Sequence, residues 1–168
     1  LAAESDVVEH QFKRDYKKLN KSWEEVYGWP LYKPLSENDA YIFDQIRRPL
    51  TDSQSEFDQL VLLLSKLIID LLNDKELAKS IGDTEGLRGI GKLEQWIKNA
   101  DVSGGEEHIT FLRNLWDLRS SGAGHAKGKS YKKASQKFSV EELPLQDVFD
   151  KILQSADSYL IFMIENFT

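Results

Sequence analysis

Arg119, Ser120 and His125 lie within seven consecutive positions of the stretch LRSSGAGHAKGKSYKK, residues 118–133. An arginine binds a phosphate through its planar guanidinium, and an imidazole transfers protons near neutral pH. A turn of small residues can bring the two groups to one concave spot. The combination suits RNA cleavage without a metal: the imidazole deprotonates the ribose 2′-OH, and fixed positive charge stabilises the phosphorus centre under attack.

A basic segment surrounds these residues. Residues 113–138 hold seven Lys or Arg side chains against the single Asp117, although the whole chain has a net charge of −6. The segment is either a local anion-binding patch or a solvated strip that balances neighbouring carboxylates. As a patch, it would contact the RNA backbone through Arg113, Lys127, Lys129, Lys132 and Lys133.

Two other chemistries can be weighed for the same stretch. The sequence AGHAKGKS, residues 123–130, differs from the phosphate-binding P-loop pattern by an alanine in place of the first glycine. A P-loop follows a strand, however, and here an amphipathic helix is expected before the glycines. A zinc site is disfavoured because the chain has no cysteine and its three histidines are far apart in sequence. We therefore expect no metal and no other cofactor.

The stretch also has a purely structural interpretation. His125 can cap or pack within a glycine-rich loop, while Arg119 pairs with Asp117 or Glu107. The spacing alone leaves both interpretations open.

The length of 168 residues fits one domain over residues 1–168. The absence of cysteine favours a cytoplasmic protein. The longest apolar runs, such as LVLLL at 60–64, are too short for a membrane span or a secretory signal. Because the chain begins at Leu1 rather than methionine, we expect it to be excised from a longer protein or to be processed.

Apolar spacing near 3.6 residues predicts helices along most of the chain, and strand signals are nearly absent. Residues 73–91 are polar and contain glycines, so they are expected to form a loop. Three pairs have the spacing of a capping box, namely Ser36 with Asp39, Ser53 with Glu56 and Ser139 with Glu142. The fold class predicted is all-α, an antiparallel bundle of five to six helices over about 8–26, 40–46, 57–72, 92–100, 108–119 and 139–164.

The stretch LRNLWDLRSSGAGHAKG, residues 112–128, resembles the signature of the HEPN superfamily. That signature is an arginine, a polar residue and, after a few variable positions, a histidine, here Arg119, Ser120 and His125. The resemblance is closest to HEPN domains at the C-termini of abortive-infection and ApeA-like defence proteins. Serine stands where the family most often has asparagine or aspartate, and the interval before the histidine is rich in glycine.

The resemblance implies a metal-independent endoribonuclease of phage defence or toxin–antitoxin systems. Such domains are helical and usually form a homodimer whose two motifs face each other across a cleft. Arg119 would bind and polarise the scissile phosphate of the RNA, His125 would be the general base or acid, and Ser120 would position them. A sensor domain or an antitoxin partner would control the activity. Some HEPN domains have lost catalysis and serve in RNA or nucleotide binding or in dimerisation.

A plain protein-interaction bundle is a further alternative. It would bind its partner through surfaces that carry tryptophan. Trp29 stands beside Pro30 in a predicted loop, so of Trp23, Trp29, Trp96 and Trp116 it is the one expected either to be exposed or to form a lid on the core.

Overall fold

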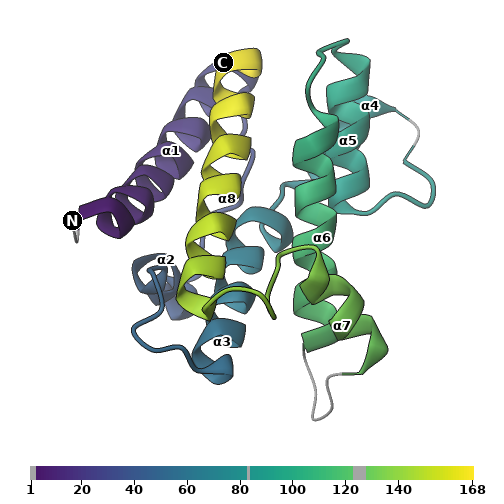
Figure 1. Cartoon of the computed structure of the whole chain (residues 1–168). Helices are drawn as coiled ribbons and strands as arrows, with labels where there is room; N and C mark the ends of the chain where they lie inside the picture. The colour runs from purple at the N-terminus through teal and green to yellow at the C-terminus, as the bar shows by residue number, and fades with distance from the viewer. Residues whose placement is uncertain (1–2, 83, 123–127) are drawn as a thin grey trace.

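The computed structural model describes residues 3–82, 84–122 and 128–168, and the part it describes is helical without a named strand (Figure 1). The all-α prediction is confirmed. One isolated bridge joins Tyr32 to Leu72. The helices are α1 (Ala3–Tyr27), η1 (Glu37–Asp39), α2 (Tyr41–Gln45), α3 (Gln54–Ser65), η2 (Lys66–Asp70), α4 (Asp74–Ile81), α5 (Gly89–Asn99), α6 (Glu106–Gly122), α7 (Lys129–Gln136) and α8 (Leu145–Phe167).

The first and last helices, α1 and α8, form the largest helix pair and run parallel to each other (Figure 1). Tyr27 near the end of α1 donates a hydrogen bond from its hydroxyl to the carbonyl of Phe167 at the end of α8, at 2.9 Å. Both helices bury a stripe of apolar side chains at helical spacing, as the sequence predicts. Val26 is an exception, because it is 55% exposed and lies outside the α1 stripe.

The central apolar stretch folds as α3 and continues directly into η2, a π-helical turn. Ser53 caps α3 as predicted, because its hydroxyl accepts a hydrogen bond from the Glu56 amide. The helix α6 packs against α3 and α8 and runs antiparallel to both: His108 near its start contacts Phe162 near the end of α8. Buried Ile109, Leu112, Leu115 and Leu118 on α6 fix the rotation of that helix.

Two helices form where the sequence indicates none. The helix α4 lies within residues 73–91, which were expected to be a loop. Its only buried side chain is Leu77, so the sequence of this helix contains no repeated apolar spacing that would predict it. The helix α7 follows Gly128, and Tyr131, Ala134 and Ser135 bury one of its faces. The count of five to six helices is therefore too low for the described part of the chain.

Two of the three expected capping boxes are wrong. The Ser36 hydroxyl donates to the Asp39 carboxylate at 3.1 Å rather than capping a backbone amide, and only the short η1 follows. Ser139 has a positive φ of 58° and lies in a turn. The last helix instead begins at Leu145 after Pro144, whose fixed φ suits the residue before a helix.

The four tryptophans do not share one environment. Trp23, Trp29 and Trp96 gather with Tyr27 and Phe167 in one aromatic cluster, with ring centroids of Trp23 and Trp96 5.2 Å apart. Trp29 is partly buried in this cluster, which agrees with a lid on the core rather than with an exposed side chain. Trp116 on α6 is the tryptophan that faces solvent, at 39% exposure. No helix in the described ranges has the length and apolarity needed to cross a membrane.

Candidate functional site at the end of α6

The last turn of α6 carries Arg119 and Ser120. Leu115 and Leu118 are buried on the inner face of the helix, so its rotation leaves Arg119 at the side and Ser120 exposed. Successive residues of an α-helix are rotated by about 100°, and these two side chains therefore face different directions. Arg119 lines a hollow of about 430 Å³ between α3 and α6, whereas Ser120 lines another of about 530 Å³ between α6 and α7.

The Arg119 guanidinium is held by one carboxylate and one ring. Its Nη1 lies 2.6 Å from Asp70 Oδ2, and its Cζ lies 5.1 Å from the centroid of the Trp116 ring. The partner is thus Asp70, at the end of η2, and neither Asp117 nor Glu107 as the structural interpretation expected. The Arg119 side chain is 23% exposed. A guanidinium has five N–H donors, so one such bond orients the group without using its full capacity.

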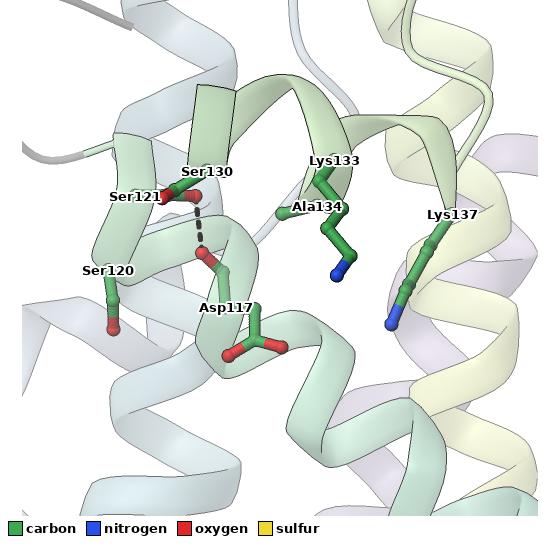
Figure 2. Close-up of a pocket in the computed structure, with 7 residues that line it drawn as sticks. All are labelled: Asp117, Ser120, Ser121, Ser130, Lys133, Ala134 and Lys137. Atoms are coloured by element: carbon green, nitrogen blue, oxygen red, sulfur yellow. Dashed lines mark hydrogen bonds between the residues drawn. The ribbon is translucent and has the colours of Figure 1, made fainter. Parts of the chain in front are cut away.

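The hollow beside Ser120 is lined by two basic side chains, Lys133 on α7 and Lys137 directly after that helix. Figure 2 shows Lys133 and Lys137 extending their ammonium groups toward the side of the hollow where the Asp117 carboxylate lies. The Ser120 hydroxyl lies at the opposite edge of this group and points away from the lysines. Lys137 also donates to the Asn114 side chain at 3.3 Å. The hollow therefore combines two cations with one carboxylate, which suits a solvated anion such as a phosphate.

Four of the five expected RNA-contacting residues lie in the described part of the chain, on α6 and α7. Lys129, Lys132 and Lys133 are exposed on α7. Arg113 lies six residues before Arg119 on α6 and makes two bonds of 3.0 Å to the Glu94 carboxylate on α5. This bidentate pair holds the pKa of Glu94 below its usual value and raises that of Arg113. The positive charge of Arg113 is therefore already compensated by the Glu94 carboxylate.

His125 and Lys127 lie outside the described residues, as do the other positions of 123–127. The structure consequently does not test whether the imidazole meets Arg119. The P-loop-like stretch also falls largely in this segment; its last two residues, Lys129 and Ser130, begin α7.

A polar cluster that the sequence does not indicate joins α3 to α7. The Gln54 side-chain amide donates to Asp58 at 2.8 Å and to the Tyr131 hydroxyl at 2.9 Å. Burial raises the pKa of Tyr131, and the bond from Gln54 partly opposes that change. The cluster fixes the beginning of α7 against α3. The helical spacing of Tyr131, Ala134 and Ser135 is a sequence signal that could have predicted α7. No sequence signal indicates that Asp70 pairs with Arg119, because the two residues are 49 positions apart.

Among the described residues, no group of three potential metal ligands comes together. No family model, no curated protein and no solved structure matches this chain.

Proposed function

We propose that this chain is a metal-independent endoribonuclease of the HEPN type, in which Arg119 and His125 act on a phosphodiester of RNA. The observation that carries the proposal is the position of Arg119. Its guanidinium is oriented by Asp70 and Trp116 at the accessible end of α6, directly before the segment that contains His125. Hollows lie on both sides of this helix end, so an extended strand has room to reach it.

The proposed reaction is a transesterification. The His125 imidazole takes the proton of a ribose 2′-OH, and the resulting alkoxide attacks the adjacent phosphorus. The bond from phosphorus to the 5′-oxygen breaks, and that oxygen takes up a proton. The products are a 2′,3′-cyclic phosphate end and a 5′-hydroxyl end. Arg119 stabilises the additional negative charge on the phosphoryl oxygens through two parallel N–H donors.

Supporting residues have distinct roles in this proposal. Lys129, Lys132 and Lys133 are exposed on α7 and provide positive charge for the RNA backbone. Ser120 lies at the edge of the same basic hollow. A homodimer is proposed as the active form, because a second copy would bring another Arg119 and His125 to the same cleft.

One observation favours the non-catalytic alternative, a HEPN module that binds RNA or a nucleotide. The 2.6 Å ion pair with Asp70 already uses part of the Arg119 guanidinium, and an ion pair of this kind can serve packing alone. Under this alternative, removing Arg119 leaves Asp70 without its cation. The variant would then lose stability without any loss of catalysis, because the wild type would have none.

The test is incubation of a mixed RNA pool with wild type, Arg119→Ala, Arg119→Lys and His125→Ala in EDTA. We expect wild type to produce cyclic-phosphate ends, and each Ala variant to lose about 100-fold or more in rate with helicity retained. Arg119→Lys keeps the charge but not the planar fork, so it should also lose most of the rate.

Arg14→Ala is the matched control, because Arg14 is 69% exposed on α1, far along the chain from the motif. It should cleave as wild type does. Sizing chromatography of the same samples tests the dimer. Absence of cleavage by wild type under all pool conditions contradicts the nuclease proposal, and equal rates for wild type and His125→Ala contradict the role of the imidazole.

A further inference from the structure

A third hollow, of about 620 Å³, opens between α6, the start of α5 and the end of η2. Its volume falls within the range of about 300–1,000 Å³ typical of small-ligand sites. Apolar side chains of Ile69, Leu87, Ile90 and Trp116 line it, and charged groups stand at its rim. We call it the Trp116 hollow.

Trp116 lines this hollow, and the Arg119 guanidinium lies over its ring. The three other tryptophans pack in the aromatic cluster, whereas Trp116 is 39% exposed although neighbouring Leu115 on the same helix is fully buried. A large aromatic side chain left in water forgoes the free energy of burial. An exposed indole that lines a concave site is suited to stack on a flat ring.

Three charged residues at the rim pair with residues beside the hollow, and Arg88 adds a further cation to its lining. Asp70 binds Arg119 at 2.6 Å, and Asp74 lies 3.8 Å from Lys92. Arg113 binds Glu94 through two bonds. A flat ring with polar edges fits this lining, because it can stack on the indole while its N–H groups meet carboxylate oxygens such as those of Asp70.

We propose that the Trp116 hollow binds a nucleobase, and that this base belongs to the RNA strand whose phosphate Arg119 contacts. The inference rests on the proposed function. Arg119 follows Trp116 by three residues on one helix face, and its Cζ lies 5.1 Å from the ring centroid. A nucleotide that gives its phosphate to Arg119 therefore has its base, or that of its neighbour, within reach of the indole.

The experiment uses the uncleaving His125→Ala background in EDTA, titrated with single-stranded oligonucleotides of RNA. Replacing Trp116 by Leu should weaken binding by about 5- to 100-fold, whereas Trp116→Phe should retain most of the affinity because it keeps an aromatic face. RNA should also quench part of the tryptophan fluorescence, and that part should be absent in the Phe variant. Tyr41→Leu is the matched control, because Tyr41 is 50% exposed on α2 and distant from the hollow in the chain.

A second arm distinguishes the two sources of a nucleobase. Titration with nucleoside monophosphates should give much weaker binding than the oligonucleotide does. Equal affinity for both would identify a free nucleotide as the ligand and overturn the assignment to an RNA strand. Unchanged affinity in Trp116→Leu would overturn the base site altogether.

The failure of this inference differs from the failure of the proposed function. If wild type cleaves RNA and Trp116→Leu cleaves it with the same KM, the nuclease stands and the Trp116 site is wrong. If wild type does not cleave RNA but binds it through Trp116, the nuclease is wrong and the base site stands.

Discussion

Two carboxyl groups, Asp15 on α1 and Asp157 on α8, meet between the parallel first and last helices. Each residue is only 8% exposed, and Oδ1 of Asp157 has no hydrogen-bond partner among the described residues. Burial is the largest cause that raises the pKa of Asp157, to about 7, followed by the hydrogen bond and the charge of Asp15. Arg14 opposes the change, but it lies 3.7 Å from Asp15 on a largely exposed side chain.

The sign of the pH dependence follows from this raised pKa. The folded state holds a proton on Asp157 that the unfolded chain releases near pH 3.8. The stabilisation is therefore complete below about pH 4 and is lost as the pH rises to about 7. About three pKa units correspond to roughly 4 kcal/mol at 1.36 kcal/mol per unit, and partial access of water to the pair reduces the expected effect to about 1–3 kcal/mol.

Asp157→Asn tests this reasoning. The amide has nearly the volume of the carboxyl, carries no charge at any pH and can donate a hydrogen bond to Asp15. We expect the variant to be more stable than wild type by about 1–3 kcal/mol at pH 8, with the difference vanishing near pH 4. The measurement is urea unfolding followed by circular dichroism across this range at constant ionic strength.

Groups that titrate in both proteins, such as His108, whose pKa is lowered chiefly by burial, contribute equally to both unfolding free energies. Their contribution therefore cancels in the difference between Asp157→Asn and wild type at each pH. Glu165→Gln provides the control, because Glu165 is exposed on the same helix. It should change stability by less than about 0.5 kcal/mol at every pH. A variant Asp157→Asn that is less stable than wild type at pH 8 would show that the carboxylate is charged and well paired, which contradicts the reasoning.

Two further predictions concern RNA binding and the start of α3. The affinity for single-stranded RNA should fall steeply as the salt concentration rises. Replacing Lys129, Lys132 and Lys133 on α7 by Gln should reduce the slope of log affinity against log salt by about 2, at about 0.7 per phosphate contact. Lys21→Gln on α1 is the control, and an unchanged slope in the α7 variant would place the RNA surface elsewhere. Ser53→Ala should lower stability by about 1 kcal/mol, a fall in Tm of about 2–4 °C, because the Glu56 amide loses its cap; a Tm equal to that of wild type would mean that water replaces the hydroxyl without cost.

Local regularity explains how much of the fold is predictable from the sequence. The long helices α1, α3, α6 and α8 repeat apolar residues over several turns, and the pattern indicates both the helix and its buried face. The Ser53 cap is likewise a contact between near neighbours in sequence. Short helices are harder, because α4 and α7 have eight residues each and bury few side chains.

The candidate site also combines features that the sequence predicts with features that depend on the tertiary structure. The sequence alone determined that Arg119 stands in the last turn of α6, since the period of Leu112, Leu115 and Leu118 sets the rotation of that helix. Only the tertiary structure decided that Asp70 is its ion-pair partner, that Ser120 faces another hollow, and that Trp116 rather than Trp29 is exposed. These outcomes depend on how separate helices dock, and docking is set by the combined burial of many side chains from distant parts of the chain, which no local pattern encodes.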